Sequence, residues 1–236
     1  MPHEKSQPKP DFGVRSYLLP KISAEGVPVV AVSFVLSFVL GAMSEFLGVL
    51  GLIFSIFSFY FFRDPERYAP DVAGAIIAPA DGRLLPVTES ALPPELKAGG
   101  EKYVKLSIFM SVFDVHVNRN PASGKVLAVK YVEGKFFNAD LDKASKDNER
   151  SIALVETAGG NRICYAQIAG LVARRIVSRL RAGQSVSAGE RFGLIKFGSR
   201  LDIYVPKGAY ELKVAAGQTM IAGETVLAQP KNTPAR

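Results

Sequence analysis

A long apolar stretch near the N-terminus constrains the fold of this chain more than any other feature. Residues 27–62 read VPVVAVSFVLSFVLGAMSEFLGVLGLIFSIFSFYFF, and a single charge, Glu45, divides them into runs of 18 residues (27–44) and 17 residues (46–62). As a helix, each run would measure about 26 Å, which is barely enough to cross a hydrocarbon core of about 30 Å. The pattern predicts a membrane-associated helical hairpin over 22–62, with Glu45 at its far turn and both ends cytoplasmic. Basic residues flank the stretch on both sides: Arg15, Lys21, Arg63 and Arg67.

Three other interpretations of this stretch compete with a spanning hairpin. A signal peptide fits poorly, because the stretch is too long and no short apolar region ends in a clean cleavage site. A shallow re-entrant hairpin and a pair of buried core helices both stay open. With a membrane hairpin, the formal charge of +7 indicates attraction to anionic headgroups, so we expect the chain at the cytoplasmic face of the cell membrane. A nucleic-acid partner is not expected, because the sequence shows no basic patch interleaved with aromatic residues.

Beyond the apolar stretch the sequence is typical of a β protein. After RDPERYAP (63–70) come short apolar runs such as YVKLSIFMS, KVLAVKYV and RICYAQIAG, separated by glycine, proline and asparagine turns. Many short strands at regular spacing favour a mainly β domain over 63–236, built as a sandwich or barrel. One or two short helices are also expected, the clearest in AGLVARRIVSRL (169–180), where the apolar residues fall near helical spacing. The basic segment 1–21 is expected to be a disordered tail.

Two motifs occur twice in the β region. PADGRLLPV (79–87) matches PASGKVLAV (121–129), and GQSVSAGE (183–190) matches GQTMIAGE (217–224). Each copy places a glycine turn before a short strand, which predicts an internally repeated domain with two related hairpin units around a pseudo-twofold axis. The second motif is similar to turns of the biotinyl and lipoyl hybrid barrels. Neither copy carries the exposed lysine that such a carrier requires, so a carrier function is not expected.

Few residues in the sequence could carry acid–base or metal chemistry. The chain has a single cysteine, Cys164, which excludes an intramolecular disulfide and a cysteine-based metal site. Of its two histidines, His3 lies in the N-terminal tail, which leaves His116 for any chemistry that needs an imidazole. One usable histidine cannot supply the ligands of a zinc peptidase, so no metal site is expected.

Asp81, His116 and Ser199 are the candidate catalytic residues, and each also has a structural interpretation. Asp81 in APADGR could be a turn aspartate before a glycine, and His116 in FDVHVNRNP could be a core histidine. Ser199 in KFGSRLDIYVP could be the first residue of a half-buried strand. Together the three offer a hydroxyl, a base and a carboxylate to orient the base. The G-x-S-x-G elbow of lipases is absent, because no glycine lies two residues after Ser199.

The Gly198-Ser199 pair permits a chemistry that needs no separate substrate. The hydroxyl of Ser199 can attack the carbonyl of Gly198, which has no side chain to obstruct it. The resulting ester can break by β-elimination, which frees a chain ending at Gly198 and converts Ser199 into a pyruvoyl group. That group is an electrophile that forms a Schiff base with an amine and acts as an electron sink, as pyridoxal phosphate does.

The sequence resembles the phosphatidylserine decarboxylase proenzyme family in its short bacterial and archaeal form. The resemblance runs through nearly the whole chain after the apolar stretch, and the combination of motifs is highly specific. It is carried by FFRDPER (61–67), APADG (78–82), SVFDVHVNRNPASGKV (111–126), GKFFNADLDKASKDNER (134–150), QIAGLVARRIV (167–177) and RFGLIKFGSRLDIYVP (191–206).

This resemblance implies self-cleavage between Gly198 and Ser199 into a β chain (1–198) and an α chain (199–236) that begins with a pyruvoyl group. It implies that Asp81 and His116 act with Ser199 as the triad for cleavage, His116 as the base and Asp81 as its orienter. It further implies decarboxylation of phosphatidylserine to phosphatidylethanolamine, through a Schiff base to the pyruvoyl group and without a metal or pyridoxal phosphate. The expected partners are phosphatidylserine, the anionic membrane surface indicated by the basic charge, the β and α chains of the same precursor, and a second copy of the processed heterodimer.

Two departures from the family pattern affect these expectations. FDVHVNR keeps only one of the two histidines in the D-Y-H-R-V-H pattern of longer members, and Phe197-Gly198-Ser199-Arg200 stands where L-G-S-T is common. Arg119 is therefore our candidate for binding the substrate phosphate, with a structural arginine as the alternative. The rival function is a non-catalytic, membrane-tethered β-barrel binding module in which Gly198-Ser199 is only a turn.

Overall fold

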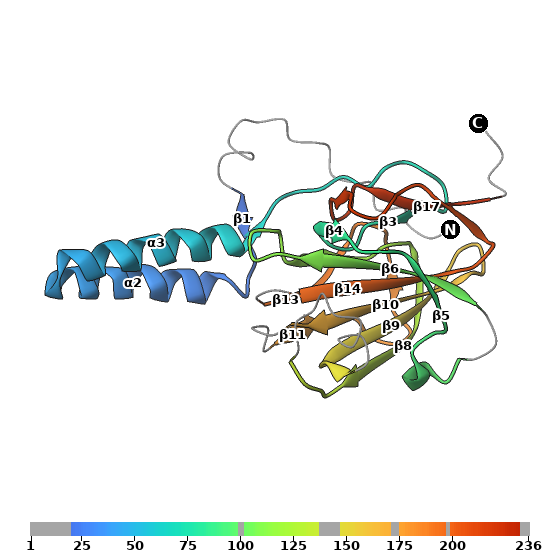
Figure 1. Cartoon of the computed structure of the whole chain (residues 1–236), viewed down its shortest axis with the longest axis horizontal. Helices are drawn as coiled ribbons and strands as arrows, with labels where there is room; N and C mark the ends of the chain where they lie inside the picture. The colour runs from blue at the N-terminus through green and yellow to red at the C-terminus, as the bar shows by residue number, and fades with distance from the viewer. Residues whose placement is uncertain (1–19, 99–101, 137–146, 171–174, 197–198, 232–236) are drawn as a thin grey trace. The chain divides into compact units, whose positions relative to one another are not determined.

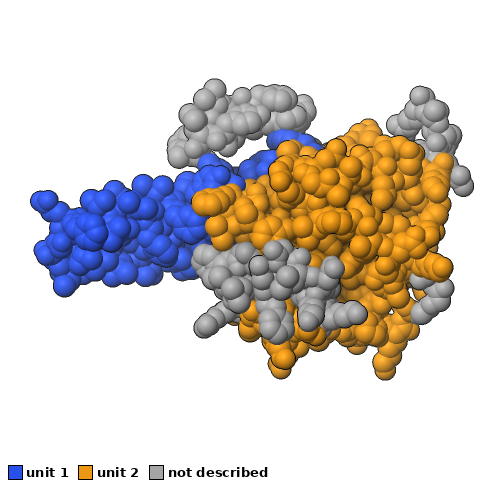
Figure 2. All heavy atoms as spheres, viewed as in Figure 1, with its two compact units in different colours: residues 1–68 blue, residues 69–236 orange. Residues whose placement is uncertain are grey.

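The computed structural model describes residues 20–98, 102–136, 147–170, 175–196 and 199–231. The chain splits into two compact units, residues 1–68 and 69–236 (Figure 2). Two helices dominate the described part of the first unit, whereas the second consists mostly of strands (Figure 1). The prediction of a mainly β protein is thus confirmed.

The helices of the first unit are α2 (Val27–Met43) and α3 (Glu45–Phe61), which run antiparallel and side by side (Figure 1). Only Ser44, in an extended conformation, separates them. The segments that lead into and out of the helices pair as a short antiparallel ladder between β1 (Lys21–Ile22) and β2 (Arg63–Asp64).

Small residues allow the two helix backbones to approach each other closely. A Cβ atom added to Gly48 would lie 2.6 Å from the Cα atom of Gly41, and one added to Gly51 would lie 2.8 Å from the Cα atom of Ser37. Both distances are too short for carbon atoms that are not bonded to each other. Larger side chains at these two glycines would therefore push α2 and α3 apart.

The helix pair exposes most of its large apolar side chains and buries its serines. Several of the buried serine hydroxyls donate to carbonyls of their own helix, as Ser33 does to Val30 O at 2.8 Å and Ser55 does to Gly51 O at 2.8 Å. Phe38 is 78% exposed and Phe46 is 69% exposed. No helix among the described residues combines the length and apolar character needed to cross a membrane. The four buried serines are Ser33, Ser37, Ser55 and Ser58.

The second unit is built around a nine-stranded antiparallel sheet that curls on itself (Figure 1). The strands follow one another across the sheet as β12 (Ser185–Val186), β8 (Gly124–Val132), β9 (Arg150–Thr157), β10 (Arg162–Ala169), β14 (Ser199–Pro206), β6 (Tyr103–Met110), β4 (Gly82–Leu84) and β16 (Thr219–Met220), and β5 (Thr88–Ser90) also pairs with β6.

Two three-stranded sheets complete this unit. One has the order β11 (Ile176–Ser178), β13 (Arg191–Ile195) and β7 (Val117–Arg119). The other has the order β15 (Tyr210–Leu212), β17 (Val226–Pro230) and β3 (Ile76–Ile77). A single turn of 3-10 helix, η1 (Pro94–Leu96), follows β5.

The strands of the repeated motifs pair with each other in matching register. Val186 lies opposite Gly124 where β12 pairs with β8, and Met220 lies opposite Gly82 where β16 pairs with β4. Each copy of the first motif therefore pairs with one copy of the second. The copies of the first motif are 42 residues apart (121 − 79), and those of the second are 34 residues apart (217 − 183). In residue number, the first offset relates β7 to β3, and the second relates β11 to β15 and, to within one residue, β13 to β17.

The turns of the two motif pairs match in detail. The backbone N–H of Gly183 donates to Val126 O, and that of Gly217 donates to Leu84 O, both at 2.7 Å. Both glycines have a φ angle of +85°, a left-handed conformation that side chains disfavour. The glycine in each copy of the motif is thus required by the same turn.

Strand β14 lies at the centre of the large sheet and is buried on both faces, not half-buried as its alternating pattern indicated. Leu201 and Ile203 face the larger core, while Tyr204 belongs to a second apolar cluster on the opposite face. Arg200 and Asp202, which point to that second face, are 1% and 0% exposed and form an ion pair with each other. The face of β14 that was expected to be exposed to solvent is therefore buried, and its two charged residues neutralise each other.

The predicted helix over 169–180 is wrong for the residues that the structure describes there. Ala169 is the last residue of β10, and Ile176–Ser178 form β11. Within β11, Ile176 and Val177 pair with Ile195 and Leu194 of β13. The apolar spacing fits both periods, and the backbone partners offered by β13 decide in favour of a strand. Residues 171–174 lie outside the described part of the chain.

Candidate functional site at the start of strand β14

Ser199 is the first residue of β14 and is completely buried. It lies opposite Met110 at the end of β6 and opposite Ala169 at the end of β10. Its hydroxyl Oγ is 3.8 Å from the thioether Sδ of Met110, a weak hydrogen-bond acceptor. Gly198, the other residue of the predicted cleavage site, lies outside the described residues.

His116 lies between β6 and β7 and is 2% exposed. Its ring nitrogen Nδ1 is 2.9 Å from the carbonyl oxygen of Asp114. Because a carbonyl can only accept a hydrogen bond, Nδ1 carries the proton in the neutral ring and Nε2 carries the lone pair. The tight turn before His116 is held by the Asp114 carboxylate, which accepts a hydrogen bond from Ser111 N at 2.7 Å. The geometry therefore leaves Nε2 as the basic atom of this residue.

Asp81 lies one residue before β4, and its Oδ1 accepts a hydrogen bond from Ala222 N at 2.7 Å. The matching residue of the second motif copy, Ser123, accepts the same bond from Ala188 N at 2.9 Å. Since a serine accepts the matching bond, the bond at Asp81 joins the two motifs structurally and does not itself require a carboxylate. The role of Asp81 as the orienter of His116 stays a prediction.

Two of the three predicted catalytic residues, Ser199 and Asp81, lie beside the C-terminal end of β6. Ser199 on β14 lies opposite Met110 on one side of β6, and β4, which Asp81 precedes, pairs with the other side. Two strand spacings separate β4 from β14, which corresponds to about 10 Å between their backbones. His116 follows in the chain, and Asn118, two residues later, contacts Met110 Sδ at 3.7 Å. The sheet thus gathers residues that are far apart in the sequence.

Arg119 is buried within β7, where its guanidinium Nη1 donates to Gly189 O at 3.1 Å. This is the arrangement expected of the structural alternative, because the group is engaged with the backbone inside the domain. Its assignment to the substrate phosphate stays a prediction.

Sequence reasoning missed two buried polar side chains that lead to Ser199. Gln167 on β10 donates to Asn118 Oδ1 at 2.9 Å, and both residues are at most 2% exposed. The signal was present, because Gln167 is a lone amide in the apolar run RICYAQIAG and Asn118 lies in the strand that follows His116. Their partners on other strands could not be read from the sequence.

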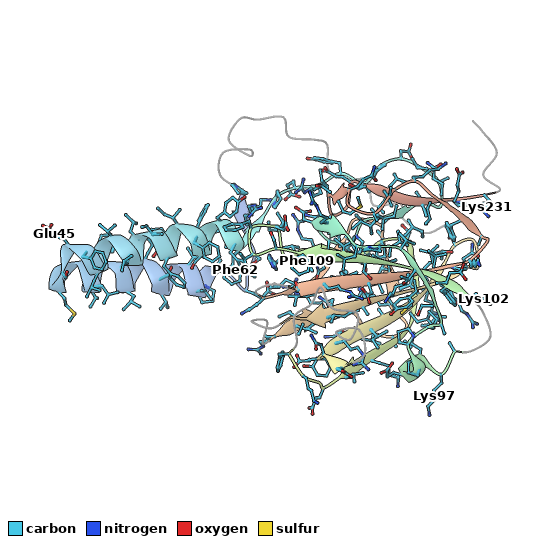
Figure 3. The ribbon with its side chains drawn as sticks, in the orientation of Figure 1. Glu45, Phe62, Lys97, Lys102, Phe109 and Lys231 are labelled. Atoms are coloured by element: carbon cyan, nitrogen blue, oxygen red, sulfur yellow. The ribbon has the colours of Figure 1, made fainter. Side chains whose placement is uncertain are left out.

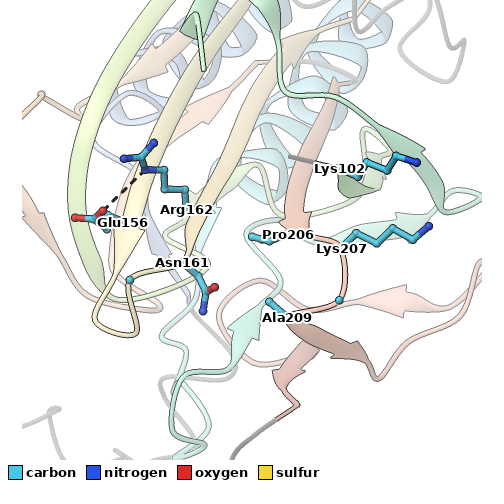
Figure 4. A pocket seen from close by; sticks show the side chains of 9 residues that line it. Lys102, Glu156, Asn161, Arg162, Pro206, Lys207 and Ala209 are labelled. Atoms are coloured by element: carbon cyan, nitrogen blue, oxygen red, sulfur yellow. Dashed lines mark ion pairs between the residues drawn. The ribbon is translucent and has the colours of Figure 1, made fainter. Parts of the chain in front are cut away.

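One cavity of the β unit lies away from this site. It has a volume of about 990 Å³, is lined by Lys102, Arg162 and Lys207 among others, and adjoins Pro206 at the far end of β14 (Figure 4). Pro206 is seven residue steps along the extended strand from Ser199, which corresponds to about 23 Å. Figure 3 shows Phe109, near the C-terminal end of β6, well apart from Lys102, which precedes the strand. The cavity is therefore distinct from the Ser199 site.

Comparison with known proteins identifies the family. The model of the phosphatidylserine decarboxylase family matches residues 54–228. Proteins named phosphatidylserine decarboxylase proenzyme from Rickettsia africae (strain ESF-5) and Rickettsia conorii are each 49% identical over 207 residues, which cover 88% of this chain and 89% of theirs. The chain belongs to the phosphatidylserine decarboxylase family. The corresponding protein of Rickettsia felis is 48% identical over the same coverage.

Phosphatidylserine decarboxylases depend on a pyruvoyl group, and the word proenzyme refers to the uncleaved precursor. The surroundings of Ser199 fit this group. The side-chain carbon of Ser199 becomes the methyl group of the pyruvoyl group, which the apolar Met110 side chain would cover. The amide of Asn118 contacts the same sulfur atom. Among the described residues, no group of three or more His, Cys, Asp or Glu side chains could hold a metal ion.

Proposed function

We propose that this chain is a proenzyme that cleaves itself between Gly198 and Ser199 and then decarboxylates phosphatidylserine to phosphatidylethanolamine. The names of its relatives support the reaction. The observation that carries the proposal for this chain is the position of Ser199. It is completely buried as the first residue of β14, and its hydroxyl contacts Met110 Sδ, which the buried amide of Asn118 also contacts.

Self-cleavage begins with the addition of Ser199 Oγ to the carbonyl carbon of Gly198. The hydroxyl proton goes to a base, for which His116 Nε2 is the candidate because Nδ1 is already protonated. The C–N bond then breaks and its nitrogen takes up a proton, which leaves an ester. Loss of the α-proton of Ser199 expels the carboxylate of Gly198, and water replaces the nitrogen as ammonia leaves.

The pyruvoyl group supplies an electrophilic carbonyl that withdraws electrons from the bond to the departing carboxylate. The protein's part is to hold the new N-terminus in place. Strand β14 pairs with β6 from Ser199 to Pro206 and with β10 from Ser199 to Tyr204. Both neighbours belong to the β chain, so these ladders keep the α chain at the site after cleavage. The burial of Ser199 also excludes bulk water from the reacting centre.

Intact-mass measurement of the purified protein tests this function. We expect two chains, with the smaller one beginning at residue 199 and carrying a blocked N-terminus. Ser199→Ala should stay a single chain, and His116→Ala should stay mostly uncleaved. A single full-length wild-type chain under every condition would instead support the non-catalytic binding module. Normal cleavage of His116→Ala would remove His116 from the role of base.

We propose further that α2 and α3 dock the enzyme on the cytoplasmic face of an anionic membrane. The exposed apolar side chains of the pair, with its serines turned inward, suit a lipid environment better than water. A lipid substrate would then be reached without leaving the bilayer. Flotation with vesicles that contain phosphatidylserine should recover the wild-type chain, and Phe38→Asp combined with Phe46→Asp should abolish recovery. Protease protection of both helix-pair ends would show whether the pair spans the bilayer or dips into it.

We also propose that the β unit is an internal duplication around a pseudo-twofold axis, as the sequence motifs predicted. The support is the matching register of β12–β8 and β16–β4, the matching turn hydrogen bonds, and the correspondence of the two three-stranded sheets. The large sheet then reads as two halves, β12-β8-β9-β10 and β14-β6-β4-β16, that meet between β10 and β14. On this proposal, Ser199 lies on β14, the strand of one half that borders the other half.

A further inference from the structure

A chain of buried polar contacts leads from the protein interior to Ser199. Met110 Sδ is 3.8 Å from Ser199 Oγ and 3.7 Å from Asn118 Nδ2, so the hydroxyl and the amide approach the same sulfur atom. On the other side of Asn118, Gln167 Nε2 is 2.9 Å from Asn118 Oδ1 and 3.3 Å from Val177 O. All four side chains in this series of contacts are buried: Ser199, Met110, Asn118 and Gln167.

The orientation of the Asn118 amide follows from this chain. Val177 O is a carbonyl and can only accept, so the NH₂ group of Gln167 must face it. The same NH₂ group faces Asn118, which therefore turns its oxygen toward Gln167 and its own NH₂ group toward Met110 Sδ. The Val177 carbonyl thus determines, through two amides, that an N–H donor faces the sulfur atom that Ser199 Oγ also approaches.

This arrangement satisfies its polar groups poorly. The donor of Asn118 faces a thioether, a weak acceptor, although buried amides normally find strong partners. Gln167 Oε1 is buried and has no hydrogen-bond partner among the described residues. Two apolar residues at these positions would fill the core without either defect. An amide donor held against a weak acceptor is instead suited to a stronger acceptor that exists only during a reaction.

We infer that Asn118 stabilises the negative oxygen formed in self-cleavage and that Gln167 is its positioning residue. When Ser199 Oγ adds to the preceding carbonyl, the electron pair of the C=O bond moves onto oxygen, and this charge is returned when the C–N bond breaks. An N–H donor at the site lowers the barrier because it binds the charged oxygen more strongly than the neutral carbonyl. The inference rests on the proposed self-cleavage at Ser199.

The test is the rate at which newly synthesised full-length chain converts into two chains, followed after a pulse of cell-free synthesis. Asn118→Leu keeps the approximate shape but removes the donor, and it should slow cleavage about 10²–10³-fold. Gln167→Leu leaves Asn118 in place but removes the group that fixes its orientation, and it should slow cleavage less.

Asn120→Leu is the matched control. Asn120 is also a buried asparagine, 1% exposed, but its side chain accepts a hydrogen bond from Tyr165 Oη at 2.7 Å and is not part of the chain to Ser199. It should lower thermal stability as Asn118→Leu does, measured in an uncleavable Ser199→Ala background, while leaving the cleavage rate within about threefold of wild type.

Hydroxylamine identifies the step at which Asn118 acts, because it cleaves an ester but not an amide. If Asn118 assists the addition step, Asn118→Leu contains no accumulated ester, and hydroxylamine leaves its cleavage slow. Rapid cleavage of this variant by hydroxylamine would place the defect in the later elimination and overturn the assignment.

The remaining outcomes are also decisive. Cleavage of folded Asn118→Leu at the wild-type rate, or equal slowing by Asn120→Leu, would overturn the inference while the proposed function stands. Should Asn118→Leu not fold, wild-type cleavage of Gln167→Leu would refute the positioning role. If the wild-type chain itself never yields a product beginning at residue 199, the proposed function fails first.

Discussion

Replacement of Asp202 by asparagine should destabilise the uncleaved chain by about 3–5 kcal/mol, the range measured when one partner of a buried ion pair is removed. The structure places this pair at the upper limit of burial. Arg200 Nε donates to Asp202 Oδ1 at 2.6 Å and Nη2 donates to Oδ2 at 3.1 Å, and neither residue is more than 1% exposed. Asparagine keeps the shape of Asp202 but removes the charge that neutralises the guanidinium.

The measurement is thermal unfolding in a Ser199→Ala background, where the chain stays in one piece and unfolding is unimolecular. For a domain of this size, about 1 kcal/mol corresponds to about 2–4 °C in Tm. Asp202→Asn should therefore lower Tm by about 6–20 °C. The double variant Arg200→Met, Asp202→Val removes both charges and should recover most of that loss, because two apolar side chains need no neutralisation.

Two results would refute this reasoning. A Tm change of less than about 3 °C for Asp202→Asn would mean that water or other groups neutralise Arg200 as well as the carboxylate does. A double variant as unstable as the single one would mean that lost packing, and not an uncompensated charge, causes the effect.

Three further predictions concern other buried or strained positions. Burial raises the pKa of the Cys164 thiol well above its ordinary value, so Ellman's reagent should react with it at pH 8 only after unfolding. Burial disfavours ionisation of Glu95, but hydrogen bonds from the backbone and from Arg150 outweigh it and lower its pKa below the ordinary 4.5. Its stabilising contribution is therefore present above pH 4.5 and is lost as the pH falls further, so Glu95→Gln should weaken the acid dependence of unfolding. Gly82→Ala should prevent folding, judged by the yield of soluble chain, because φ is +142° and a Cβ would lie 2.1 Å from a carbonyl oxygen of β6, whereas Gly160→Ala, which meets nothing within 4 Å, should fold.

Much of the β architecture could be predicted because it depends on local signals. Glycine turns and short apolar runs fixed the fold class, and the repeated motifs correctly marked segments that the structure pairs in the same register. The same local reasoning failed at Ile176–Ser178, where apolar residues matched helical spacing. A strand gains its hydrogen bonds from a distant segment, here β13, and that partner is invisible to a pattern read along the chain.

For the candidate site, too, the sequence predicted the residue types but not their tertiary contacts. The sequence by itself supplied Ser199 after a glycine, one usable histidine and an aspartate in a turn, because the chemistry of self-cleavage needs those residue types. Only the tertiary structure decided that β14 is covered on both faces, so that Arg200 and Asp202 neutralise each other instead of facing water. Only the tertiary structure brought Gln167 to the Ser199 site through Asn118. Burial and hydrogen-bond partnership arise from strands that are distant in sequence, whereas residue chemistry is carried by each position alone.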